Sequence, residues 1–283
     1  MRQVRPLLVN HGHRPDVVVA TRMSPGAREA LSRAGIGWVD ETGAAEIAIG
    51  SLIVSRTGRP GEAVDKPARW TPSVMAVAEA LLCGTKPTVA ATAEATGLST
   101  GSCTGALRVF TDLGLLEAEV SRGRDSARHV VDFNQFLDAY ASAALRKKPR
   151  TSLRVGVIWN DVVAGLRDTG RAWDDSGASW AATGAVASLV LAPLLTRVST
   201  AEVFVNGDTT AELRAVAERV GLRPIDGGRL TLLPFPTVTA LRLATRTEGL
   251  RVAPWPRIYA DLRGTGVRGE EAAEHLREVI LER

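Results

Sequence analysis

The sequence predicts a mixed α/β protein of several domains, and three observations support this. The chain has 283 residues, 45% of them hydrophobic, which is enough to bury more than one core. Strand-like and helix-like segments alternate at both ends of the chain, whereas the middle is mostly helical with one hairpin. We therefore expect a small α/β domain over residues 1–68, a mostly helical domain over 69–149 and an α/β domain over 150–283.

The composition limits the classes of binding partner and the cellular compartment that we expect for this protein. A formal net charge of +4 permits a nucleic-acid partner, and an aromatic content of 5% argues against a stacking platform for single strands. Cys83 and Cys103 form no CxxC pair, so neither a disulfide scaffold nor a zinc site is expected. No signal peptide is recognisable, and the longest apolar run, Trp180–Leu195, is shorter than the ~20 residues of a membrane span. We expect a cytoplasmic protein without cofactor, metal or membrane partner.

The first domain is predicted to begin with a buried strand over Asp16–Thr21. A helix follows, capped by Ser24 and ended by Gly35. Two further strands are expected on either side of a turn at Thr42–Gly43. The remaining segments are a strand over 51–56 and a Gly- and Pro-rich linker over 57–67.

The central domain contains a helix-turn-helix pattern. Helices are predicted over Thr71–Gly84, Thr88–Gly97 and Phe133–Pro149, and a further helix begins behind a Ser99 cap. The second helix and the one capped by Ser99 meet at a glycine turn with Leu98 in the corner, which is the helix-turn-helix plan. Their inner face is expected to comprise Ala91, Ala95, Cys103, Ala106, Leu107, Phe110 and Leu113.

The opposite face of the helix after Ser99 carries mostly small and hydroxylated residues. In such a motif the second helix lies in the major groove, so this face supplies candidate DNA contacts. They are Ser99, Thr100, Ser102, Thr104 and Arg108. Gly101 and Gly105 on the same face each cost about 1 kcal/mol relative to alanine. Close approach to a phosphate or base edge, tight packing and simple tolerance are all open explanations.

A hairpin is expected directly after this helix, with strands over Leu115–Val120 and Ala127–Val131. Contacts between its basic side chains and phosphates would supply affinity, while the helix would supply sequence choice. A solvated turn is the alternative. The candidate contacts are Arg122 and Arg124 at the tip and Arg128 and His129 on the returning strand.

The last domain is predicted to alternate between helices and strands, without a P-loop, a nucleotide-binding fingerprint or a nucleophile–base pair. No enzymatic activity is therefore expected. The predicted elements are helices over Asn160–Gly165 and Trp180–Thr196, a strand over Ala201–Gly207, a helix from near Asp208, a strand over Arg229–Pro236, and helices over Leu250–Gly264 and Gly269–Arg283.

The stretch LSTGSCTGALRVFTDLGLL resembles the recognition helix of bacterial winged-helix transcriptional regulators. Gly105 stands where a basic or polar side chain is common in that family, which removes one base contact. The resemblance implies a winged helix-turn-helix over 69–149 that binds double-stranded DNA. The matching residues are Leu98, Ser99, Ser102, Thr104, Ala106, Leu107, Arg108, Leu113, Gly114 and Leu115.

The C-terminal segment resembles the antitoxins of type IV (abortive infection, AbiEi-like) toxin–antitoxin systems. The matching residues are Thr183, Gly184, Tyr259, Asp261, Leu262, Arg268, Gly269, Glu271, Ala272, Ala273 and Leu276. The resemblance implies an autorepressor that opposes a nucleotidyltransferase-like toxin, and it leaves a homodimer open. From the residues alone, Tyr259, Leu262, Ala273 and Leu276 can instead be core contacts between two closing helices.

The N-terminal segment resembles a degenerate restriction-endonuclease-like domain. Asp40 and Glu46 would be its two metal-binding acids, but Ala48 occupies the place of the lysine, so catalysis is not expected. Asp40 can instead cap a hairpin turn. His11, His13 and Asp16 give too weak a pattern for a metal site.

The expected function is therefore a sequence-selective, double-stranded-DNA-binding transcriptional regulator that represses its own operon. Two alternatives stay open. One is a nuclease or DNA-repair protein targeted by the winged helix, and the other is an antitoxin that acts mainly by contact with its toxin.

Overall fold

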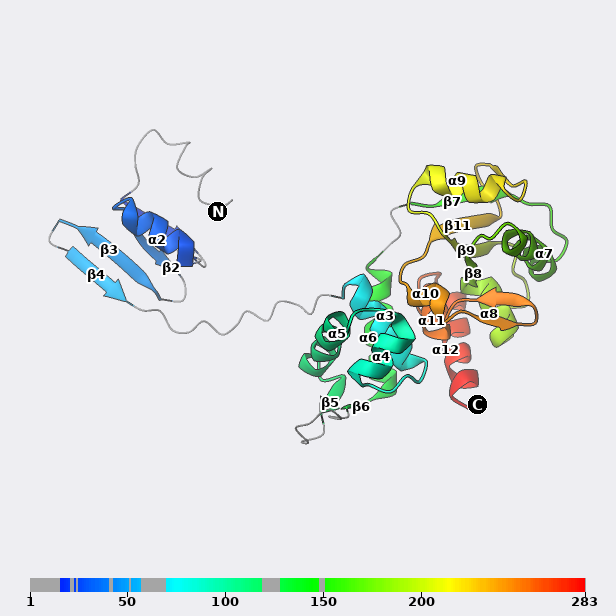
Figure 1. Ribbon diagram of the computed structural model, residues 1–283, viewed down its shortest axis with the longest axis horizontal. Helices are drawn as coiled ribbons and strands as arrows, with labels where there is room; N and C mark the ends of the chain where they lie inside the picture. Colours follow the sequence, from blue (N-terminus) through cyan, green and yellow to red (C-terminus); the bar gives the residue numbers. More distant parts are fainter. Residues whose placement is uncertain are drawn as a thin grey trace. The chain divides into compact units, whose positions relative to one another are not determined.

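The computed structural model has a mixed α/β fold made of two compact units, residues 1–67 and 68–283 (Figure 1). The described residues are 16–20, 23, 25–40, 43–50, 52–56, 70–118, 128–147 and 151–282. The expected linker and the hairpin tip with Arg122 and Arg124 lie outside them. Within the described residues, no helix combines the length and the apolar character that crossing a membrane requires.

The first unit is a four-stranded sheet with one helix (Figure 1). In the order β1-β2-β3-β4, the first pair is parallel and the other two are antiparallel. Its elements are β1 (Val17–Ala20), α2 (Pro25–Arg33), β2 (Gly37–Asp40), β3 (Ala45–Ile49) and β4 (Leu52–Arg56). Its small core contains Met23, Leu31, Ile36, Trp38 and Ala44.

Strand β1 is confirmed, but the expectation that it is buried is wrong. Val18 and Ala20 pack against the small core, whereas Val19 is 74% exposed. Successive side chains of a strand point to opposite faces, and β1 lies at the edge of the sheet. An apolar run alone therefore does not show that both faces of a strand are covered.

The second unit begins with a helical half, residues 70–147. The expected helices and hairpin are confirmed there. The elements are α3 (Pro72–Leu82), α4 (Val89–Thr96), α5 (Thr100–Asp112), β5 (Leu116–Ala118), β6 (Arg128–Val130) and α6 (Phe133–Leu145). Strands β5 and β6 pair antiparallel. Each helix begins where a side-chain oxygen accepts a hydrogen bond from a backbone N–H of the first turn, and these caps are Thr71, Thr88, Ser99 and Asp132.

The inner face of α4 differs from the prediction. The buried residues are Thr92 and Thr96, while Ala91 and Ala95 are only partly covered. Each threonine hydroxyl donates to the backbone carbonyl four residues earlier, at 2.7 and 2.6 Å, so its burial leaves no unsatisfied polar group. Leu113, also expected inside, is 39% exposed because α5 ends one residue before it.

The sheet half, residues 151–282, is built on a seven-stranded mixed sheet of order β10-β7-β11-β9-β8-β13-β12 (Figure 1). Pairs β11–β9 and β13–β8 are parallel, and the others are antiparallel. Its elements are β7 (Leu153–Gly156), α7 (Val162–Asp175), β8 (Trp180–Thr183), α8 (Gly184–Leu191), β9 (Ala201–Val205), α9 (Thr210–Glu218), β10 (Arg223–Pro224), β11 (Leu230–Pro234), α10 (Thr239–Arg242), β12 (Thr245–Thr247), β13 (Leu250–Val252), α11 (Trp255–Arg263) and α12 (Val267–Leu281).

Three predicted helices of this half have wrong bounds. The segment Trp180–Thr196 is strand β8 followed by α8, which ends before Pro193, and the chain turns between them at Gly184, where φ is +59°. All four β8 residues are buried, so the strand shows no polar alternation. The predicted helix over Leu250–Gly264 likewise begins with strand β13, and α7 is longer than the predicted Asn160–Gly165.

A buried carboxylate joins the two halves of the second unit. Glu79 of α3 is fully buried, and Tyr140 of α6 donates its hydroxyl to Oε1 at 2.5 Å. From the sheet half, the Thr237 hydroxyl donates to Oε2 at 2.7 Å, and the Thr239 hydroxyl donates to the same oxygen. Burial raises the pKa of Glu79, while these hydroxyls and the charge of Arg257 act to lower it. Segments far apart in the sequence thus share one polar group that water does not reach.

This burial predicts a pH dependence of stability. Because the folded state raises the pKa of Glu79 above its usual 4.5, it holds that proton more tightly than the unfolded chain does. The free energy of unfolding therefore falls as pH rises from the unfolded-state value through the folded one, by at most about 1.4 kcal/mol per pH unit. We expect the wild type to lose stability over this range relative to Glu79→Gln, whose amide does not titrate.

Urea unfolding at a series of pH values measures the difference between the two proteins. Glu218→Gln, an exposed position on α9, is the control for removal of one carboxylate from the surface. An advantage of the wild type over Glu79→Gln that grew with rising pH would contradict the prediction.

Candidate nucleic-acid interface

Helix α5 is held by its inner face and leaves its outer face exposed. It follows a turn at Gly97, where φ is +71°, and the Ser99 side chain accepts a hydrogen bond from the backbone N–H of Ser102 at 3.2 Å. Its first turn has no acidic residue to offset the positive end of the helix dipole. The buried residues, as predicted, are Cys103, Ala106, Leu107 and Phe110.

Three predicted contact residues of α5 share its outer side at four-residue spacing, and Ser102 lies at the edge of the buried face. Thr100, Thr104 and Arg108 are exposed, and Ser102 is half-buried. The Thr104 hydroxyl donates to the Thr100 carbonyl at 2.8 Å, and the Ser99 and Ser102 hydroxyls lie 3.0 Å apart. Each hydroxyl oxygen retains acceptor capacity, so the face can still take hydrogen bonds from a partner.

The two glycines of α5 face open space. Among the described residues, a Cβ added at Gly105 would meet no atom within 4 Å, and one added at Gly101 would meet only the Ser99 hydroxyl, at 4.0 Å. Tight packing within the described part of the protein therefore does not explain either glycine. Because the two positions are four residues apart, they lie on the same side of the helix and leave its backbone uncovered there.

Arg108 is the exposed arginine on the described part of this face. Its side chain is 82% exposed, and its Nε lies 3.9 Å from the carboxylate of Asp112, one turn later. An exposed pair of this kind contributes little to stability, about 0–1 kcal/mol, so a phosphate can replace the aspartate as partner.

The described base of the hairpin places its two basic residues on different faces. Glu117 pairs with His129 across the strands, and Ala118 pairs with Arg128. The His129 Nε2 lies 3.4 Å from the Glu117 carboxylate, with both side chains exposed, while Arg128 is half-buried. Neighbouring strand residues point to opposite faces, so His129 and Arg128 do not present a joint surface. The tip arginines lie outside the described residues.

In the first unit, the Asp40 carboxylate forms a structural ion pair with Arg28. It is 3% exposed and accepts a hydrogen bond from Arg28 of α2 at 2.7 Å, and Met23 donates its backbone N–H to it. Its own backbone closes the turn to β3 by accepting from Gly43 and donating to Ala44. Asp40 therefore shapes the hairpin through its main chain, while its carboxylate fixes α2.

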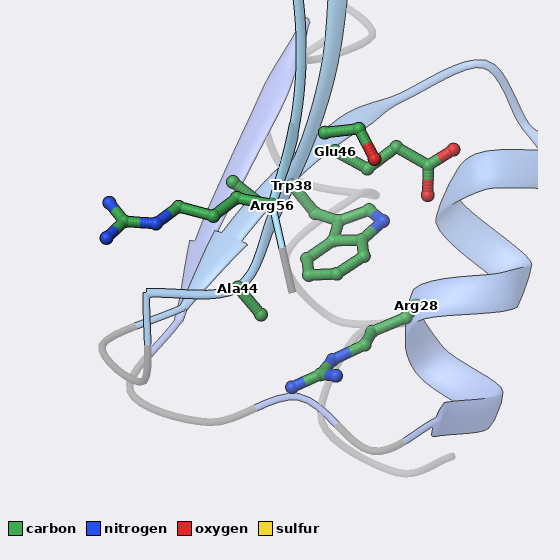
Figure 2. Close-up of a pocket in the computed structure, with 7 residues that line it drawn as sticks. Arg28, Trp38, Ala44, Glu46 and Arg56 are labelled. Atoms are coloured by element: carbon green, nitrogen blue, oxygen red, sulfur yellow. The ribbon is translucent and has the colours of Figure 1, made fainter. Parts of the chain in front are cut away.

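Glu46 is exposed and lines an open pocket of about 240 Å³ on the α2 side of the sheet, which Arg28 of that ion pair also lines (Figure 2). It accepts a hydrogen bond from Ser32 at 2.6 Å, and Trp38, paired with it across the strands, donates its indole N–H to the same serine. The cavity is lined by Arg28, Trp38, Ala44, Ala45, Glu46, Ser55 and Arg56. Within the described part of the chain, no three His, Cys, Asp or Glu side chains are grouped to hold a metal ion.

One residue that the sequence did not single out contacts the helix pair. Arg242 of α10 donates through Nε to the Ala95 carbonyl and through Nη2 to the Glu94 carbonyl, both at 3.0 Å. Its Nη1 would lie 3.2 Å from a Cβ at Gly97. The contact spans almost 150 residues of sequence, so no local pattern indicates it.

Comparisons of the chain with models of protein families, with curated proteins and with solved structures find no match in any of the three.

The open glycine face makes a prediction about stability. Gly105→Ala should raise the free energy of unfolding by about 1 kcal/mol, because alanine is the better helix former and no described atom obstructs its methyl group. Thermal and urea unfolding measure the change. Gly170→Ala in α7 is the matched control: its Cβ would lie 2.2 Å from Cζ2 of buried Trp180, so it should destabilise by about 1–3 kcal/mol. A loss of stability in Gly105→Ala would contradict the assignment of an open face.

Proposed function

We propose that the protein is a sequence-selective, double-stranded-DNA-binding transcriptional regulator. In this proposal α4 and α5 form a helix-turn-helix, and the β5–β6 hairpin is its wing. The observation that carries the proposal is the outer face of α5, where two glycines without packing partners among the described residues lie beside hydroxyl side chains and one exposed arginine. A glycine that costs helix stability and serves no packing role is favoured where a partner approaches the backbone closely.

The geometry of α5 fits the wide groove of a duplex. The N-terminal turns of a recognition helix contact base edges, and here those turns carry Ser102 and Thr104 beside the bare backbone of Gly101 and Gly105. Arg108 lies one turn further along and is placed for a base edge or a phosphate. Affinity would come from phosphate contacts of the hairpin arginines. Autorepression, a cytoplasmic location and the absence of an enzymatic step belong to the same proposal.

A toxin partner is not part of this proposal. The residues that carry the antitoxin resemblance are mostly buried where helices α11 and α12 pack on each other and on α8. These residues contribute to the packing of the helices, and their burial does not indicate a particular binding partner. The buried ones are Thr183, Gly184, Tyr259, Leu262, Gly269, Ala272, Ala273 and Leu276.

The direct experiment is a gel-shift titration of the full chain with the DNA upstream of its own gene, and with sequences selected from genomic fragments. We expect a salt-sensitive shift and a preference for a subset of sequences over random duplex of the same length. Absence of a shift with both kinds of DNA at low salt would overturn the proposal.

The hairpin arginines give a prediction about affinity. Replacing Arg122 and Arg124 together by alanine should weaken binding to all sequences alike. The slope of log K against log salt should fall by about 0.9 for each phosphate that the variant no longer neutralises. Binding titrations at several salt concentrations measure the slope. The charge-matched control is Arg214→Ala in α9 combined with Arg219→Ala at the C-cap that follows it, because both arginines are exposed. Equal effects of the two double variants would assign the weaker binding to net charge and not to the hairpin.

The α5 side chains give a prediction about preference. Ser102→Ala and Arg108→Ala should each change the ranking of sequences, and discrimination should fall by about 1–3 kcal/mol at the base pairs they read. Selection from a random library, followed by sequencing, measures the ranking for each variant. If the preferred sequences were unchanged in both variants, α5 would not be the reading helix.

A further inference from the structure

The sheet half holds the turn between α4 and α5 through one short segment, residues 237–242, which contains α10 (Figure 1). At its start, the hydroxyls of Thr237 and Thr239 donate to buried Glu79 of α3. At its end, Arg242 donates to two backbone carbonyls in the last turn of α4. Helix α10 accordingly packs on both α3 and α4. One segment thus fixes two helices of the helical half relative to each other.

Arg242 acts as a cap for α4. The last carbonyls of a helix lack partners within it, and an arginine there satisfies them and offsets the negative end of the helix dipole. In α4 the Gly97 N–H donates a hydrogen bond to the Ala93 carbonyl, and the Arg242 guanidinium donates to the carbonyls of Glu94 and Ala95. The planar guanidinium reaches both carbonyls at once, which a lysine ammonium does not reproduce.

The same turn leaves little room beside the guanidinium. A Cβ at Gly97 would lie 3.2 Å from Arg242 Nη1, and φ of +71° is itself unfavourable for other residues. On the other side of the turn, the Thr96 hydroxyl accepts the Leu98 N–H at 3.2 Å. The point where α5 begins is therefore held from the sheet half and from α4 together.

We infer that Arg242 is a positioning residue for DNA reading. It fixes the α4–α5 turn in the free protein and so presents α5 in its reading orientation before DNA arrives. The inference rests on the proposed function, and it assigns the sheet half a part in DNA binding that requires no contact with DNA. Pre-organisation of this kind raises affinity by removing an ordering cost from the binding step.

The test uses the full chain with Arg242→Ala, Arg242→Lys and the control Arg214→Ala, at an exposed position of α9. The first measurement needs no DNA: amide hydrogen exchange of the turn and the start of α5, residues 97–103. We expect exchange there to be about tenfold faster in Arg242→Ala and Arg242→Lys than in the wild type and the control. The thermal midpoint of each variant shows whether the fold is intact.

The second measurement is the affinity for selected and random DNA at several salt concentrations. A positioning role predicts that Arg242→Ala and Arg242→Lys both bind the selected sequence about tenfold more weakly, while the salt slope stays unchanged. A direct phosphate contact predicts a slope lower by about 0.9 in Arg242→Ala and recovery in Arg242→Lys, because lysine also binds phosphate. The second pattern would overturn the inference.

Failure of the inference is distinguishable from failure of the proposed function. Unchanged exchange at residues 97–103 in Arg242→Ala overturns the positioning role whether or not the wild type binds DNA. Absence of DNA binding by the wild type overturns the proposed function and the reading role with it, while accelerated exchange would still establish that Arg242 holds the turn.

Discussion

The structure of the second unit depends on the burial of one carboxylate. A buried acidic group is costly unless its oxygens receive hydrogen bonds, and Glu79 receives three of them only when α6 and residues 237–239 converge on α3. The helical half on its own would leave two of these donors missing. The helical half and the sheet half also share one hydrophobic core and belong to one compact unit, although sequence patterns alone suggest a boundary between them.

Helix α5 packs on α3, the helix that carries Glu79. Once α3 and α6 are fixed, α5 packs its buried residues against α3, and its opposite face has no neighbour among the described residues that would explain Gly101 or Gly105. Interior glycines elsewhere show the contrast, since Gly170 makes room for the ring of Trp180. The two glycines thus lower the stability of the helix, and the packing of α5 does not require them. Residues that lower stability in this way are common on surfaces that bind a partner.

In the first unit, the two acidic residues that could bind a metal each contact a different side chain. Asp40 and Glu46 lie on the face of the sheet that carries Trp38, as two metal-binding acids would, yet each is engaged by a different neighbour. Arg28 holds Asp40 and also lies 5.1 Å above the ring of Trp38, so this aspartate, arginine and tryptophan are mutually fixed. The spacing of acidic residues in a sequence identifies candidate metal ligands. Whether each one can bind a metal or has a structural role depends on the side chains that it contacts in the fold.

The sequence by itself determined the features that local physics controls. Helix starts at Thr71, Thr88 and Ser99, the glycine turn and the polar face of α5 were all predictable, because caps, turns and periodicity act over a few residues. Only the tertiary structure decided that Trp180–Thr183 is a strand, since burial on both faces removes the alternation that marks one. Only the tertiary structure revealed that Arg242 donates hydrogen bonds to α4. Every residue has a backbone carbonyl, so this contact leaves no pattern in the sequence of the accepting helix.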